Sequence, residues 1–236
     1  MSKEVHSLHV FFIPFLAHGH IIPTVDMAKL FAEKGVKATI ITTPLNAPFI
    51  SKAIGKSKTN HNAIHIQTIE FPRVDAGLPD GCENIDSIPS PILFEAFTMA
   101  TRLIQKPFEQ LMAEQRPDCV VADLFFPWAT DSAAKFGIPR LAFQGTSFFS
   151  SCATTYMGLY EPYNDVSSGS ELFIIPNLPG EIKMTRAQVP PFITCKEKTG
   201  VAKLLVEARE SELRSYGAVF NSFYELEKVY ADHFKN

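Results

Sequence analysis

Short apolar runs alternate with segments of helical periodicity along the first part of the chain. Residues 8–13 (LHVFFI) form a continuous apolar run that predicts a buried strand. From Ile22 the apolar positions recur at helical spacing, and Pro23 suits the first turn of a helix. Residues 37–42 (KATIIT) are rich in β-branched side chains and predict a second strand. Together these segments form a strand–helix–strand unit, which is almost always right-handed and parallel.

The same alternation extends along the rest of the chain, apart from two stretches rich in turn-forming residues. Those stretches are 72–91 and 161–199, which we expect to be irregular. Further strands are predicted at 64–69, 117–122, 140–143 and 218–221, and helices at 91–115, 127–136, 146–160, 201–216 and the end of the chain. This alternation predicts the α/β class, with a doubly wound parallel sheet covered by helices on both faces. No boundary interrupts it, so we expect a single Rossmann-like domain over residues 1–236.

Composition narrows the class of protein. The chain has 236 residues and a formal charge of −3, so it lacks the positive field that a nucleic-acid-binding protein needs. The apolar stretch 8–17 is too short to span a membrane and lacks a small-residue cleavage site. None of Cys82, Cys119, Cys152 and Cys195 belongs to a CxxC pair, which disfavours a zinc ribbon or a redox dithiol. We therefore expect a soluble, cytoplasmic protein with reduced thiols.

Two titratable residues lie where α/β sheets bind their ligands, beyond the carboxyl ends of the strands. His20 lies between the first predicted strand and its helix, and Asp123 directly follows the strand at 117–122. In the common doubly wound order the first and fourth strands are neighbours, about 4.8 Å apart, so the two loops are able to meet. A carboxylate beside an imidazole fixes its tautomer and stabilises the imidazolium. The pair therefore predicts a general base that accepts a proton from a substrate hydroxyl.

Other roles stay open for these residues on this reasoning alone. His20 could be structural, and Asp123 could cap the helix that follows it. His18 and His20 could form a metal pair, although no third ligand lies at a suggestive spacing. The chain has no GxSxG, GxxxxGK[ST] or GxGxxG motif, which disfavours a serine hydrolase, a P-loop protein and an NAD-binding protein. Without a protein nucleophile, the hydroxyl of the substrate is the expected attacking group.

Phenylalanine is overused, with 20 Phe against six Tyr and one Trp. Rings without polar atoms need apolar surroundings, either in a core or in a hydrophobic pocket. The aromatic clusters at 125–128 and 148–149 are compatible with a core and with a pocket. Composition alone favours the core, and their place at the carboxyl edge of the predicted sheet makes a pocket comparably plausible.

Long motifs follow one another along the chain in a fixed order. They are HVFFIPFLAHGHIIP (9–23), DMAKLF (26–31), TIITTPLN (39–46), GLPDGCEN (77–84), PDCVVAD (117–123) with Trp128, FQGTSF (143–148), PNLPG (176–180) and VFNSFYELE (219–227). Together these motifs resemble the plant UDP-dependent glycosyltransferases of family 1. The resemblance covers nearly the whole chain.

The resemblance implies the N-terminal half of a GT-B enzyme, in which two Rossmann-like domains face each other across a cleft. In this family the N-terminal domain mainly holds the acceptor and the C-terminal domain mainly holds the UDP-sugar. By the match of motifs, His20 takes the place of the general base and Asp123 that of its partner. The implied reaction is an inverting hexose transfer, most simply of glucose, by direct displacement. The UDP-sugar is a co-substrate, and no metal or other cofactor is implied.

The resemblance also implies which residues contact the substrates. Gly19 and Thr146 would contact the donor. The acceptor pocket would be lined by Phe15, Leu16, Phe125, Phe126, Phe148 and Phe149. The loop at 82–83 could close over this pocket. Its apolar walls suit a small hydrophobic acceptor with one hydroxyl, such as a flavonoid, a triterpenoid or a steroid.

The chain departs from the family in one large respect. A complete member is much longer and carries a C-terminal donor-binding motif with a His-Cys-Gly-Trp-Asn-Ser core, whereas the single Trp here is Trp128. We expect the UDP-sugar to bind mainly through a C-terminal half that this chain lacks, and the chain alone to be inactive. A non-catalytic domain that binds small hydrophobic molecules is the alternative. A lyase or hydrolase with the same His–Asp pair would turn over without any UDP-sugar.

Overall fold

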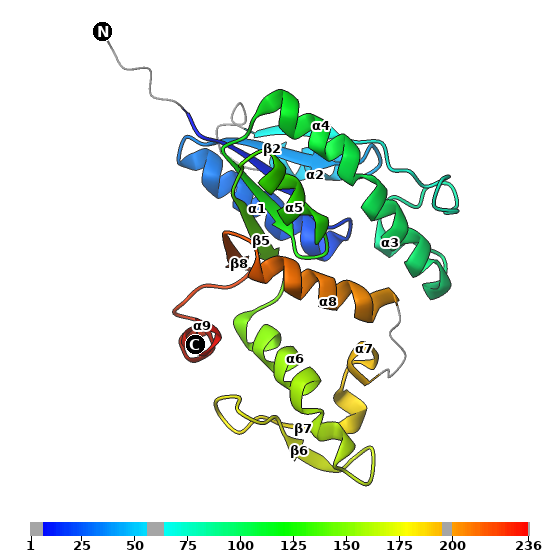
Figure 1. Cartoon of the computed structure of the whole chain (residues 1–236), viewed down its shortest axis with the longest axis vertical. Helices are drawn as coiled ribbons and strands as arrows, with labels where there is room; N and C mark the ends of the chain where they lie inside the picture. The colour runs from blue at the N-terminus through cyan, green and yellow to red at the C-terminus, as the bar shows by residue number, and fades with distance from the viewer. Residues whose placement is uncertain (1–6, 56–63, 195–199, 236) are drawn as a thin grey trace. The chain divides into compact units, whose positions relative to one another are not determined.

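The sheet of the protein carries the strand order expected of a doubly wound fold. The computed structural model describes residues 7–55, 64–194 and 200–235, so Cys195 lies outside the described residues. In this part of the chain, six strands form one sheet in the order β3-β2-β1-β4-β5-β8. Figure 1 labels β2, β5 and β8 of this sheet. The strands are β1 (His9–Ile13), β2 (Lys37–Thr42), β3 (Ile64–Thr68), β4 (Cys119–Asp123), β5 (Arg140–Gln144) and β8 (Gly217–Phe220). The pairs β3–β2, β2–β1, β1–β4 and β4–β5 are all parallel. The predicted adjacency of the first and fourth strands is confirmed.

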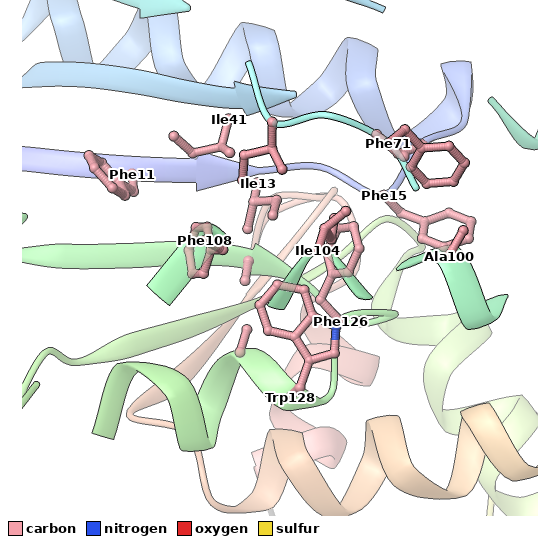
Figure 2. Packing of buried hydrophobic residues seen from close by; sticks show 14 of the residues in the cluster. Phe11, Ile13, Phe15, Ile41, Phe71, Ala100, Ile104, Phe108, Phe126 and Trp128 are labelled. Carbon is pink, nitrogen blue, oxygen red and sulfur yellow. The ribbon is translucent and has the colours of Figure 1, made fainter. Parts of the chain in front are cut away.

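Helices cover both faces of this sheet, because successive residues of a buried strand point to opposite sides. Phe11 and Ile13 of β1 face α3 (Phe94–Leu103), α4 (Gln105–Gln115) and α5 (Trp128–Lys135). Val10 and Phe12 face α1 (His18–Glu33) and α2 (Ala47–Gly55). Figure 2 shows the first of these two clusters, in which the rings of Phe108, Phe126 and Trp128 pack with the β1 residues. The predicted α/β class is confirmed.

Contacts between residues divide the chain into two compact units, although no boundary was predicted from the sequence. Unit 1 comprises residues 1–145 and 204–219, and unit 2 comprises residues 146–203 and 220–236. Helix α8 (Gly200–Leu213) begins in unit 2 and continues into unit 1.

Unit 2 has a small core of its own around α6 (Phe148–Tyr160) and α9 (Lys228–Lys235). Segment 161–199 was expected to be irregular, which is wrong in part. It contains the antiparallel pair β6 (Leu172–Ile174) and β7 (Lys183–Thr185) and the short helix α7 (Pro191–Thr194). Strands of three residues are too short for an alternating pattern to be recognised in the sequence.

Helix α1 begins earlier than predicted. The expected start was Ile22, with Pro23 in the first turn, whereas the helix starts at His18 and contains Pro23 in its interior. The first turn is closed by the N–H groups of His20 and Ile21, which donate to the carbonyl of Ala17 at 3.0 and 2.9 Å. Pro23 lies only one turn further on, so the helix loses a single backbone hydrogen bond there. His20 therefore lies in the first turn of a helix and not in a loop.

The helix expected over 91–115 is two helices that meet at Ile104. Pro107 explains the break. It has no N–H to donate to the carbonyl of Leu103, and its ring would clash with that carbonyl in a continuous helix. Helix α2, at 47–55, was not predicted, although Asn46 directly precedes it and Phe49, Ile50, Ala53 and Ile54 follow helical spacing. With nine residues it is short, and a short apolar run does not distinguish a helix from a strand.

Candidate functional site: a histidine–aspartate pair

The structure brings together the two residues singled out as a candidate base and its partner. His20 comes from the first turn of α1 and Asp123 from the last position of β4, which are neighbours because β1 and β4 pair directly. Nδ1 of His20 lies 2.7 Å from Oδ2 of Asp123. The carboxylate is fully buried, whereas 24% of the imidazole side chain is exposed. Because Nδ1 is engaged by Asp123, Nε2 is the ring nitrogen that is left to act on a substrate.

The pair is electrostatically biased towards a positively charged ring. Burial lowers the pKa of His20, but the hydrogen bond and negative charge of Asp123, with a smaller contribution from Asp86, outweigh this and raise the pKa above its ordinary value. A base held by a carboxylate in this way accepts a proton readily and holds it as an imidazolium ion.

Hydrogen bonds hold both the side chain and the backbone of Asp123 in place. Its Oδ1 accepts the backbone N–H of Phe125 at 3.0 Å. The buried guanidinium of Arg140 donates to the carbonyls of Ala122 and Asp123 at 3.2 and 3.0 Å. Burial lowers the pKa of Arg140 to about 10, against the charges of Asp123 and Glu212, so the group remains a cation at neutral pH.

Aromatic rings and one glycine surround the imidazole. The rings of Phe15 and Phe125 lie 5.5 Å from the ring of His20, measured between centroids. On a further side, a Cβ added to Gly145 would lie 3.2 Å from Nδ1 of His20. Gly145 therefore allows the backbone after β5 to approach the imidazole. No local sequence pattern predicts this contact, because it joins residues that are distant along the chain.

The residues expected to line an acceptor pocket in unit 1 differ in exposure. Phe15, Leu16 and Phe126 are buried in the core, whereas Phe125 is half-buried. Phe126 packs against Trp128, and Phe15 packs against Phe125 and Phe126. The buried rings of Phe15 and Phe126 thus belong to the core beside the site, and Phe125 is the ring with accessible surface.

The remaining residues expected at the substrates belong to unit 2, except Gly19. Thr146 is exposed, at the point where unit 2 begins. Phe148 stacks on Phe220 at 4.0 Å, and Phe149 packs edge-on against Tyr230 at 5.0 Å, so both rings contribute to packing within unit 2. Gly19 is exposed next to His20 in the first turn of α1. The roles of these four residues toward substrates stay predictions.

The loop that was expected to close over the site is anchored by polar contacts. The Asn46 side chain donates to the carbonyl of Glu83 and accepts from the amide of Asn84, at 2.8 and 2.9 Å. Oε2 of Glu83 accepts the N–H of Leu45 at 2.8 Å. Further along, Asp86 pairs with His18. Glu83 belongs to the loop that was singled out from the sequence, whereas no role at the site was predicted for Asn46, Asn84 or Asp86.

His18 and His20 do not face a common centre, since each pairs with a different carboxylate. Within the described residues, no group of three His, Cys, Asp or Glu side chains is arranged to hold a metal ion. The described helices likewise include none with the length and apolar character needed to cross a membrane.

Fold and site together define a class: a Rossmann-like domain of the GT-B type, with a His–Asp pair at the carboxyl edge of its sheet. The chain is 54% identical over 227 residues to scopoletin glucosyltransferase of Nicotiana tabacum, spanning 96% of this chain and 48% of the relative. It is 50% identical to UDP-glucose flavonoid 3-O-glucosyltransferase 7 of Fragaria ananassa, spanning 99% and 46%. No family model matches the chain.

Solved structures that are similar to this chain belong to the same class of enzyme as the sequence relatives. The crystal structure of UGT73P12 from Glycyrrhiza uralensis, complexed with glycyrrhetinic acid 3-O-monoglucuronide, is similar with a TM-score of 0.84 and 39% identity, over 97% of this chain and 46% of that one. TcCGT1 in complex with UDP shares the fold, with a TM-score of 0.70 at 17% identity. In sequence and in fold the chain corresponds to the N-terminal half of plant UDP-glycosyltransferases, which are GT-B enzymes. It spans about half the length of the curated relatives that it matches.

Proposed function

We propose that this chain is the acceptor-activating half of an inverting, UDP-sugar-dependent glycosyltransferase. The observation that carries the proposal is the 2.7 Å contact between Nδ1 of His20 and the buried carboxylate of Asp123. A purely structural histidine needs no buried carboxylate as a partner, and a non-catalytic binding domain would have no use for both groups. Homology to glycosyltransferases over nearly the whole chain supports the same reaction class.

The proposed step needs one proton transfer and one displacement. Nε2 of His20 removes the proton from the acceptor hydroxyl, while Nδ1–H remains hydrogen-bonded to Asp123. The acceptor oxygen forms a bond to the anomeric carbon of the sugar from the face opposite UDP. The bond between that carbon and the UDP oxygen breaks, and UDP leaves with the electron pair. The configuration at the anomeric carbon is inverted, and no metal is needed for the proton transfer.

The proposed acceptor is a hydrophobic plant metabolite that presents a hydroxyl to His20. Relatives are named for scopoletin, for flavonoid and anthocyanin hydroxyls and for soyasapogenol B glucuronide, so a flavonoid, another phenolic or a triterpenoid is the proposed range. Phe125 supplies an accessible apolar ring beside the base. Glucose is the proposed sugar, by analogy with relatives named as glucosyltransferases.

The donor is proposed to bind mainly to a second, C-terminal half, with Gly19 and Thr146 as the contributions of this chain. We also propose that the reaction takes place in the cytoplasm. On this proposal the chain by itself binds acceptors but transfers no sugar.

A complementation experiment tests the proposal. The chain is incubated with UDP-glucose and a panel of flavonoids, coumarins and triterpenoids, first alone and then joined to the C-terminal half of the Nicotiana tabacum relative; products are identified by mass. We expect added hexose only in the joined protein.

His20→Ala should abolish transfer and leave acceptor binding nearly unchanged, whereas His65→Ala, which changes an exposed histidine on β3, should leave transfer intact. Transfer that persists in His20→Ala would show that another group is the base. Acceptor binding without transfer in the joined protein would favour the non-catalytic domain.

A further inference from the structure

Helix α1 carries the candidate base in its first turn but lacks an N-terminal cap of its own. Ala17 occupies the cap position and has no side chain able to accept a hydrogen bond, and no acidic residue lies in the first turn. The first N–H groups of a helix need partners, and a negative charge near them is stabilising. Here the partner comes from a residue 68 positions away in the sequence.

That partner is Asp86, in the short 3-10 helix Ile85–Ser87. Its Oδ2 accepts the backbone N–H of His18 at 2.9 Å and also contacts Nδ1 of His18 at 2.7 Å. We propose that Asp86 is a positioning residue for the base: it caps α1 from outside the helix and thereby fixes the turn that carries His20. The proposal rests on the proposed function only in calling His20 the base.

Asp86 is itself rigidly mounted, which a positioning residue requires. Its backbone N–H donates to Oδ1 of Asn84 at 3.0 Å. The amide of Asn84 donates to the side chain of Asn46, and both asparagines are buried. The backbone N–H of Ile85, the residue after Asn84, donates to the carbonyl of Leu16, just before α1. The loop and the start of α1 are thus joined at two adjacent residues, Ile85 and Asp86.

The electrostatic arrangement agrees with this geometry. The hydrogen bond from the backbone of His18 lowers the pKa of Asp86, so the carboxylate is ionised at neutral pH. The charged groups that face His20 are Asp123 from β4, Asp86 from the loop and the positive end of α1, and Arg140 lies behind Asp123. The negative charge of Asp86 offsets the positive end of α1. Asp86 and Asp123 both raise the pKa of His20, because both carboxylates favour the protonated ring.

The test measures the pKa of His20 by NMR of the imidazole nitrogens in this chain, with the resonance assigned from His20→Gln. We compare wild type, Asp86→Asn, Asp86→Glu and Asp80→Asn. Asp80 is the matched control, since it lies in the same loop and its side chain is 95% exposed in a pair with Arg73. Asp86→Asn should lower the pKa of His20 by about half a unit, a size typical of a partly exposed charge. Asp80→Asn should leave it unchanged, and Asp86→Glu should restore part of the shift.

A second readout follows the helix directly. The amide protons of His20 and Ile21 close the first turn of α1, so they should exchange with solvent several times faster in Asp86→Ala than in Asp80→Asn. In the joined, transfer-competent protein, Asp86→Ala should lower kcat with little change in the KM of the acceptor.

The proposal is overturned if Asp86→Asn and Asp80→Asn give the same pKa for His20 and Asp86→Ala leaves these amides protected. That failure is distinguishable from a failure of the proposed function, in which the pKa of His20 in the wild type would not be raised and would not respond to Asp123→Asn.

Discussion

Replacement of Asp123 by Asn tests the central pair while preserving its shape. The carboxylate is fully buried, accepts the N–H of Phe125 with Oδ1 and contacts Nδ1 of His20 with Oδ2. An asparagine that keeps the contact to Phe125 with its oxygen presents its NH₂ group to the imidazole. Nδ1 must then accept instead of donate, and the ring proton moves to Nε2. The nitrogen that should remove the acceptor proton is then already protonated.

The size of the effect follows from the bond that is lost. A hydrogen bond to a charged group contributes about 1.5–3 kcal/mol, which corresponds to a pKa change of about 1–2 units for His20. The direction is downward, because burial remains and the opposing carboxylate is gone. The same free energy, lost from the imidazolium that forms in the transition state, lowers kcat/KM by about 10- to 150-fold. The inverted tautomer adds to this loss.

Two measurements check the prediction. NMR titration of the imidazole nitrogens gives the pKa of His20 in this chain, with Asp131→Asn as a control that removes an exposed carboxylate paired with Arg214. The pH profile of kcat/KM in the joined protein gives the kinetic counterpart, and its acid limb should move to lower pH in Asp123→Asn while the plateau falls. An unchanged or higher pKa of His20 in that variant would refute the reasoning, since the carboxylate would then not be what raises it.

Three further predictions concern other residues. Gly145→Ala places a Cβ 3.2 Å from Nδ1 of His20, so it should lower transfer at least tenfold with little loss of thermal stability, measured by kinetics and calorimetry on one preparation. Gly19→Ala meets no atom within 4 Å and adds a better helix former, so it should stabilise the fold by about 0.5–1 kcal/mol in urea, and a raised KM for the UDP-sugar would support a donor contact. His9 is buried and bonded to a threonine hydroxyl, and burial lowers its pKa to about 4. Because the unfolded chain then binds more protons than the folded one between pH 6.5 and about 4, stability should fall as the pH drops through this window, and less steeply in His9→Gln. Equal slopes in the two proteins would contradict this assignment.

Much of the sheet could be predicted because its determinants are local. The apolar run at 8–13 and the β-branched run at 37–42 each specify a strand buried on both faces, and the first and fourth strands became neighbours by the usual winding order. The same winding order predicts that His20 lies beside Asp123, as it does in the structure. Here a general rule of α/β folds supplied the long-range contact.

Other features depend on contacts that no local pattern encodes. The two helices at 94–103 and 105–115 were predicted as one, because periodicity does not register the effect of one proline on the preceding carbonyl. The contacts of Asp86 with His18 and of Gly145 with His20 join distant segments, and neither residue type signals such a role by itself. Phe126, an expected pocket residue, is fully buried, since aromatic runs near a sheet edge serve a core equally well.

The interleaved chain path of the two units bears on how the protein is made. Residues 204–219 complete unit 1 but follow the whole of the segment 146–203 that belongs to unit 2. The edge of the sheet next to β5 therefore stays open during synthesis until β8, at 217–220, has emerged. Contacts between segments this far apart in sequence form slowly, and an exposed sheet edge is prone to pair wrongly in the meantime. A chain that stops before residue 217 would have a sheet with an unpaired edge, so we expect chaperones to engage the nascent chain until β8 has been made.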